Sequence, residues 1–194
     1  FFFHAHPAIR DPLWSRGLGD VYKRQVFNNI SFIMKKHLSV FIFLFIFMPI
    51  VSAENQNSWS LSIGQFDVND SNDSSEIRLE RLSGKNWFGD MELKPFVGFM
   101  QNGDDGKYFY SGFRKNFTIG SKWIFTPSFA AGYYDRDSSK DLGHNIEFRS
   151  QIEFSRDIGN QNRIGFNLNH ISNASIGDTN PGVESATISI IRPF

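Results

Sequence analysis

The 194-residue sequence has no cysteine, which excludes disulfide scaffolds, thiolate zinc sites, iron–sulfur clusters and cysteine nucleophiles. It has no excess of charge either, because 20 basic side chains balance 20 acidic ones. This balance argues against a strongly basic nucleic-acid-binding protein and against an acidic tail. Long apolar runs are also scarce, although the chain contains 22 phenylalanines. Apolar and polar residues must therefore be interleaved, and the length suits one domain.

The first 53 residues are expected to lie outside the folded domain. Residues 1–33 precede a Met-Lys-Lys start at Met34, and their segment IRDPLWSRGLGDVYKRQ resembles a translated sequencing-adaptor or vector leader. Residues 34–53 have the pattern of a secretory signal peptide, in which the apolar run is shorter than the ~20 residues of a membrane-spanning helix. The domain is therefore expected at 54–194. A genuine N-terminal extension and an uncleaved anchor stay open as alternatives.

Eight runs of alternating residues follow, and turn-forming residues separate each run from the next. A typical length of about ten residues exceeds that of most globular strands and matches a tilted membrane-spanning strand. We expect strands at 59–68, 75–83, 93–101, 107–117, 122–134, 144–156, 163–172 and 184–193.

The two faces of the last three runs differ in chemistry. Apolar side chains occupy the even positions, and polar ones such as Glu147 and Arg149 occupy the odd positions. Charges of both signs on one face favour a narrow lumen filled with side chains, and the terminal Phe194 is typical of outer-membrane barrels. The pattern predicts an all-β fold, an eight-stranded, up-and-down antiparallel transmembrane β-barrel, whose closure leaves no strand edge in the lipid. Its even strand count predicts periplasmic ends and an extracellular link at 173–183.

Three polar residues break the apolar pattern in the last two runs. His170 and Ser172 are two residues apart on a strand, so both point to the apolar face. Glu184 opens the next strand on that same face and could hold the imidazole in its productive tautomer. Ionisable groups that face lipid are costly unless they are functional or interfacial. The residues therefore predict a Ser–His–Glu site facing the bilayer, with ordinary polar residues of the barrel rim as the alternative.

Residues 170–185, H-I-S-N-A-S-I-G-D-T-N-P-G-V-E-S, resemble the signature of the outer-membrane lipid A 3-O-deacylases, the PagL-like family. That family carries a His-x-Ser-Asn motif near the C-terminus and a Gly-x-Glu at the start of the last strand. The resemblance implies a multi-pass protein of the bacterial outer membrane, surrounded by its lipids. It also implies hydrolysis of the 3-position acyl ester of lipid A, the lipid part of lipopolysaccharide, in the outer leaflet, with no metal or other cofactor. A homodimer is left open.

The same resemblance assigns roles to single residues. It implies Ser172 as the nucleophile, His170 as the general base and Glu184 as the carboxylate that orients the base. Asn180 matches a position associated with the oxyanion site, and Asn173, from the His-x-Ser-Asn motif, is a further supporting residue. At residue 175 a serine stands where some members have glycine.

Two other classes of function stay open. A non-catalytic small outer-membrane barrel with a structural or adhesive role predicts that Ser172 is dispensable. A soluble lipid-binding barrel of the periplasm predicts an apolar interior and extraction without detergent.

Overall fold

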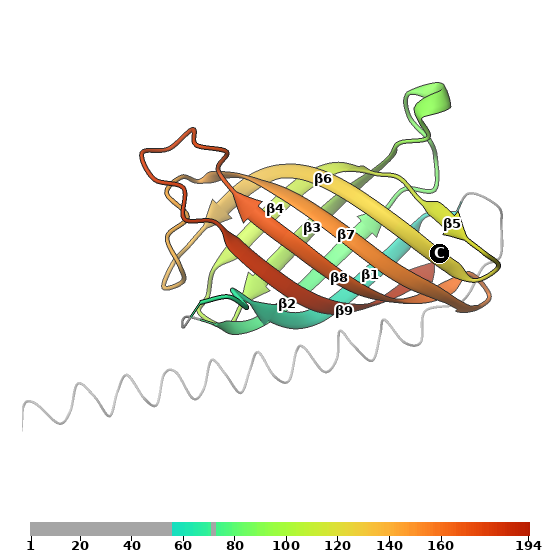
Figure 1. Cartoon of the computed structure of the whole chain (residues 1–194), viewed down its shortest axis with the longest axis horizontal. Helices are drawn as coiled ribbons and strands as arrows, with labels where there is room; N and C mark the ends of the chain where they lie inside the picture. The colour runs from blue at the N-terminus through green and yellow to red at the C-terminus, as the bar shows by residue number, and fades with distance from the viewer. Residues whose placement is uncertain (1–55, 71–72) are drawn as a thin grey trace, which may run out of the picture. The chain divides into compact units, whose positions relative to one another are not determined.

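The computed structural model describes residues 56–70 and 73–194, so the leader and signal peptide expected at 1–53 lie outside the described residues. The described chain forms one antiparallel sheet that closes into a barrel (Figure 1). Among the described residues, no helix is long and apolar enough to cross a membrane. The strands are β1 (Ser58–Phe66), β2 (Ser74–Leu82), β3 (Lys94–Asn102), β4 (Lys107–Arg114), β5 (Phe117–Ile119), β6 (Trp123–Asp135), β7 (Ile146–Gly159), β8 (Asn162–Ser172) and β9 (Val183–Pro193), and the 3-10 helix η1 (Gly89–Met91) lies between β2 and β3.

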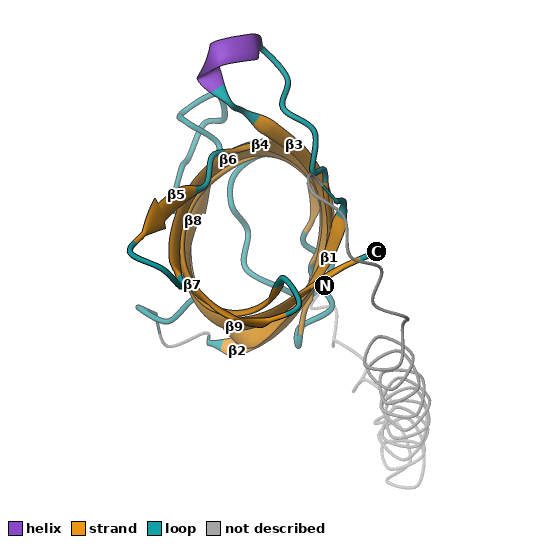
Figure 2. Ribbon diagram, turned by 90° about the vertical axis from the view of Figure 1, so that its right-hand side faces the viewer, coloured by secondary structure: helices purple, strands orange, loops and turns teal. Residues whose placement is uncertain are grey.

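Two pairings close the ring, which Figure 2 shows end-on. Strand β1 pairs with β9, and β4 pairs with β6, while all other neighbours are consecutive in the chain. Eight long strands thus form the barrel, which confirms the predicted fold class. The sequence did not predict β5, which pairs only with the start of β6. The fourth run was expected to continue to residue 117, but β4 ends at Arg114, and the chain turns back through Gly120 at a φ of +63°.

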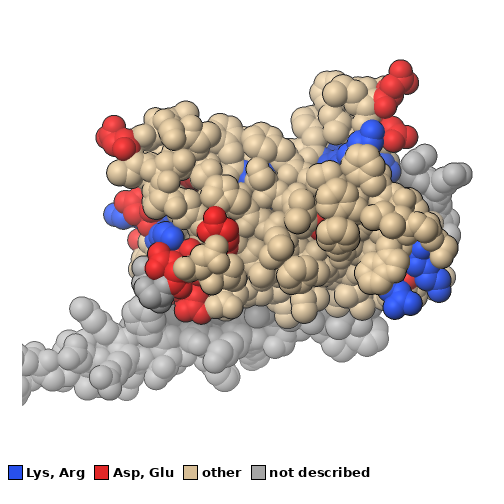
Figure 3. Space-filling model, in the orientation of Figure 1, with Lys and Arg blue, Asp and Glu red and all other residues tan. Residues whose placement is uncertain are grey.

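The period of two in the sequence corresponds to the inside and outside of the barrel. On β7 the side chains of Glu147 and Arg149 are buried, whereas Ile152 and Phe154 are exposed. On β9 the apolar Ile188 is 57% exposed. Charged side chains gather near the two ends of the barrel in Figure 3, which leaves a largely uncharged belt between them. An apolar outer belt of this kind suits a bilayer.

The lumen is packed with polar side chains. Arg149 Nη2 lies 2.8 Å from Glu80 Oε1, and its Nη1 donates a hydrogen bond to the Tyr110 hydroxyl at 3.1 Å. The Tyr110 hydroxyl in turn donates to Glu80 Oε1 at 2.9 Å. The hollow beside this network is about 10 Å³, room for about one water molecule. Such an interior contradicts the apolar lumen that a soluble lipid-binding barrel would need.

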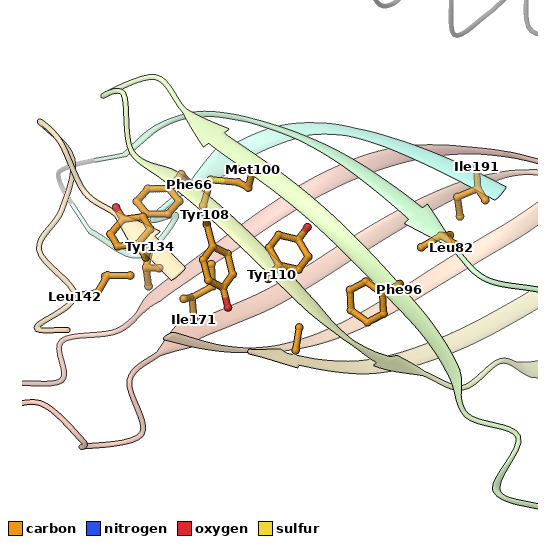
Figure 4. Packing of buried hydrophobic residues seen from close by; sticks show 12 residues of the cluster. Phe66, Leu82, Phe96, Met100, Tyr108, Tyr110, Tyr134, Leu142, Ile171 and Ile191 are labelled. Atoms are coloured by element: carbon orange, nitrogen blue, oxygen red, sulfur yellow. The ribbon is translucent and has the colours of Figure 1, made fainter. Parts of the chain in front are cut away.

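Apolar side chains close one end of the lumen, which we call the mouth. Phe66, Tyr108, Tyr134 and Leu142 gather there (Figure 4), and all four are at least 98% buried. Leu142 belongs to the connection between β6 and β7, residues 136–145, which we call the mouth loop. This loop therefore folds back over the barrel, close to the connection between β8 and β9 that the sequence marks as functional.

Candidate active site

The last two strands place His170 and Glu184 directly opposite each other on the outer wall. His170 Nδ1 lies 2.9 Å from Glu184 Oε1, and each side chain is almost half exposed. A carboxylate can only accept a hydrogen bond, so Nδ1 carries the hydrogen and Nε2 is left with its lone pair. The pair therefore orients a basic nitrogen on the lipid-facing side of the barrel.

Ser172 lies two residues beyond His170, on the same outer face and at the end of β8. Within the described chain its hydroxyl makes no hydrogen bond to His170, so the predicted nucleophile and the predicted base are neighbours without a hydrogen bond between them. Catalytic hydrogen bonds are often long before substrate binds and shorten in the complex. The parity predicted for all three residues, His170, Ser172 and Glu184, is confirmed, because each points away from the lumen.

A second serine also lies beside the imidazole. Ser150 on β7 is the cross-strand partner of His170 and is exposed on the outer face. The sequence alone does not single out Ser150, because strand register decides which residues of β7 and β8 meet. One signal was available: Ser150 is a polar residue on the otherwise apolar parity of its run. His170 is thus flanked by Ser172 along its own strand and by Ser150 across the sheet.

Asn173 organises the connection between β8 and β9 from the inside. It is fully buried, and its Nδ2 donates to the carbonyl oxygens of Thr179 at 2.7 Å and Leu142 at 2.8 Å. Its backbone N–H donates to Asn180 Oδ1 at 3.0 Å and is not free to bind an oxyanion. Because Asn180 presents its oxygen inward, its amide Nδ2 is left as a donor on an exposed residue. The two asparagines therefore differ: Asn173 shapes the loop, and Asn180 offers the donor.

The turn after Ser172 is strained. Ala174 and Ser175 have φ values of 52° and 62°, and the N–H of Ile176 donates to the carbonyl oxygen of Asn173 at 3.1 Å. Positive φ at both central residues defines a turn that normally takes glycine, asparagine or aspartate. The left-handed conformation costs other residues roughly 1–2 kcal/mol each. A glycine in place of Ser175 would remove that cost at this position.

Gly182 packs against the imidazole. It has a φ of +65°, and a Cβ placed there would lie 2.9 Å from His170 Cε1 and 3.6 Å from Nε2. A side chain at this position would push against the ring. The glycine of the Gly-x-Glu pattern is therefore required by both its backbone conformation and its contact with His170.

A family model described as lipid A 3-O-deacylase (PagL) matches residues 58–191. The chain belongs to the lipid A 3-O-deacylase family. The match runs through all the barrel strands and includes every residue of the candidate site. Membership in this family places the chain in the bacterial outer membrane, as the resemblance of residues 170–185 predicted.

Comparison with solved structures supports the same fold. The crystal structure of the outer membrane enzyme PagL aligns with a TM-score of 0.56 at 17% identity, and the alignment covers 71% of this chain and 99% of that one. A de novo designed transmembrane β-barrel aligns with a TM-score of 0.51 at 8% identity, over 74% of this chain and 98% of the design. No curated protein matches the sequence. Because a design shares the architecture, the barrel alone does not specify an activity.

Proposed function

We propose that the chain is a serine esterase that hydrolyses the 3-position acyl ester of lipid A in the outer leaflet of the outer membrane. The observation that carries this proposal is the His170–Glu184 pair, whose 2.9 Å contact stands on the lipid-facing wall of a member of the deacylase family. A half-exposed, hydrogen-bonded His–Glu pair on a wall of isoleucine and phenylalanine has no structural role in the lumen. A lipid substrate would reach it without leaving the bilayer.

The reaction needs only side chains of this chain and water. The Ser172 hydroxyl attacks the ester carbonyl carbon while His170 Nε2 takes its proton, and Glu184 stabilises the imidazolium. The tetrahedral intermediate collapses as the bond to the sugar oxygen breaks and His170 returns the proton to that oxygen. A water molecule, activated by His170, then attacks the acyl-enzyme. This second step releases the fatty acid and restores the Ser172 hydroxyl.

The negative oxygen of the intermediate requires donors beside Ser172. The amide Nδ2 of Asn180 is one candidate, since the inward-facing oxygen of the same side chain is already occupied. The backbone N–H groups of the strained turn at Ala174 and Ser175 are others. Loss of one such donor typically costs roughly 3–4 kcal/mol of transition-state stabilisation.

The test compares the two serines that flank His170. Ser172→Ala should abolish release of the fatty acid, by on the order of 10³-fold or more, as in other triads. Ser150→Ala is the matched control, because it removes a serine hydroxyl from the cross-strand partner of His170 and should retain most activity. Mass spectrometry of lipid A from cells with and without each variant gives the readout.

Three outcomes would contradict the proposal. Unchanged lipid A in cells that hold the folded wild-type barrel would favour the non-catalytic barrel. Full activity in Ser172→Ala would remove the nucleophile assignment. Loss of activity in Ser150→Ala alone would move the nucleophile to β7.

A further inference from the structure

The mouth loop is fixed to the barrel by apolar and polar contacts. Leu142 is 1% exposed and packs in the cluster that closes the mouth (Figure 4). The Tyr134 hydroxyl donates to the carbonyl oxygen of Lys140 at 3.1 Å, and Asn102 Nδ2 donates to Ser139 Oγ at 2.6 Å. The mouth loop is thus fixed against the end of the barrel and is not a free tip.

Lys140 links the mouth loop to the opposite side of the barrel wall. Its Nζ lies 2.8 Å from Asp67 Oδ2 and 3.2 Å from Asp70 Oδ2, both in the connection between β1 and β2. The Asp67 side chain is 1% exposed and that of Lys140 is 17% exposed, so this contact is largely shielded from water. Burial alone would lower the pKa of Lys140, but the hydrogen bonds with Asp67 and Asp70 outweigh it and raise the pKa. The lysine is therefore charged throughout the neutral range.

A series of contacts connects the mouth loop with Asn180, the proposed oxyanion donor. The carbonyl oxygen of Leu142 accepts from Asn173 Nδ2 at 2.8 Å, and the Asn173 N–H donates to Asn180 Oδ1 at 3.0 Å. Gly143 adds a close approach of backbones, since a Cβ there would collide with the Thr179 carbonyl oxygen. The position of Asn180 thus depends on the seating of the mouth loop.

A second line runs from Lys140 to the carboxylate of the triad. Asp67, which accepts from Lys140, directly precedes Val68. The Val68 N–H donates to the backbone carbonyl oxygen of Glu184 at 2.9 Å. The same lysine therefore connects the segments that brace Asn180 on one side and Glu184 on the other.

We propose that the mouth loop is a positioning element for the outward-facing site and that Lys140 is the positioning residue that keeps it seated. This inference rests on the proposed function. Lys140 touches no reacting atom, so its removal should lower kcat while KM, set by the apolar wall below the site, changes little. Amide exchange in residues 173–182 should rise at the same time, because the Asn173 N–H loses its fixed partner.

The experiment uses the full barrel in lipid or detergent and three variants. Lys140→Met removes the charge at similar length, Lys140→Arg keeps a cation that can reach both aspartates, and Lys107→Met is the matched control. Lys107 also lies at the mouth, but its pair with Asp137 spans 3.8 Å and is about half exposed. We expect Lys140→Met to lose kcat on the order of tenfold to a hundredfold, the scale of an ångström-sized displacement. Lys140→Arg should restore both kcat and amide protection, and Lys107→Met should change neither.

Amide exchange tests whether Lys140 holds the loop in place, and this test does not depend on the deacylase activity. If amide exchange at 173–182 is unchanged in Lys140→Met, Lys140 does not stabilise this loop, and the inference is wrong at any level of activity. Faster exchange with an unchanged kcat would overturn the positioning role. A wild-type barrel without deacylase activity would refute the proposed function, and the exchange would still decide on the bracing. If Lys140→Met does not fold, Asp70→Asn removes one of the two negative charges that Lys140 contacts and should give a smaller change in the same direction.

Discussion

Replacing Gly182 with alanine tests whether catalysis depends on the position of the imidazole and not merely on its presence. The new Cβ would lie 2.9 Å from His170 Cε1, whereas ordinary contacts begin at 3.4 Å. The ring must therefore move by about 0.5 Å, the difference between these two distances. The residue would also keep a φ of +65°, which costs an alanine roughly 1–2 kcal/mol.

The displacement acts on a hydrogen bond with little tolerance. If the whole shift of about 0.5 Å runs away from Glu184, the 2.9 Å contact with His170 stretches to about 3.4 Å, near the upper limit for a hydrogen bond. Misplacement by 1 Å can cost about 10²-fold in rate, so we expect kcat to fall by roughly tenfold to a hundredfold. The fold should survive, because the backbone cost is small beside the stability of a closed barrel.

Gly120→Ala is the control for backbone strain. Gly120 has a φ of +63°, almost the same as Gly182, but a Cβ there would meet no atom within 4 Å. Initial rates of fatty-acid release, divided by the folded fraction from unheated gel mobility, compare the two variants directly. Equal rates in the two variants would mean that contact with His170 does not matter, and this reasoning would be wrong.

Three further predictions concern the wall, the lumen and the mouth. Cysteine in place of Phe166 should react with a bilayer-restricted reagent, whereas cysteine in place of the lumen-facing Asn167 should not; the reverse result would mean a register slip of one residue. Glu80→Ala should destabilise the barrel by about 3–5 kcal/mol in equilibrium unfolding, because Arg149 is left as an unpaired buried charge; a change below 1 kcal/mol would contradict this. Because the folded pKa of Lys140 lies above the unfolded value of 10.5, the stability difference between wild type and Lys140→Met should be constant from neutral pH to pH 10.5 and shrink above it.

The strands could be predicted from the sequence because inside and outside differ so strongly in chemistry. Every long strand lies within a few residues of its expected place, and the outward parity of His170 and Glu184 followed from the same alternation. Strand β5 could not be predicted as a separate strand, since its three residues continue the apolar pattern of β4 and only residues 115 and 116 separate the two. The turn at Gly120 separates β5 from β6.

The supports of the site could not be predicted because they join distant parts of the chain. Lys140 and Asp67 are 73 residues apart, and Asn173 and Leu142 are 31 apart. No spacing rule links such residues, and several aspartates in the loops would have suited Lys140 equally well. Ser150 stayed unnoticed for a related reason, since the register between β7 and β8 is a property of the whole sheet.

An active site on the outside of a barrel has few partners, because each side chain there meets only one neighbour per strand and then lipid. The alternation of the strands compensates for this, since each outward residue of the proposed site is followed or preceded by an inward one. Asn173, next to Ser172, is fully buried and holds the loop, and Val183, next to Glu184, is fully buried as well. The lipid substrate of the proposed reaction would therefore stay in the bilayer while the residues that fix the geometry stay inside the protein. The positions of the side chains in the lipid-facing site then depend on how firmly the mouth is packed. Leu142 and Lys140 contribute to that packing.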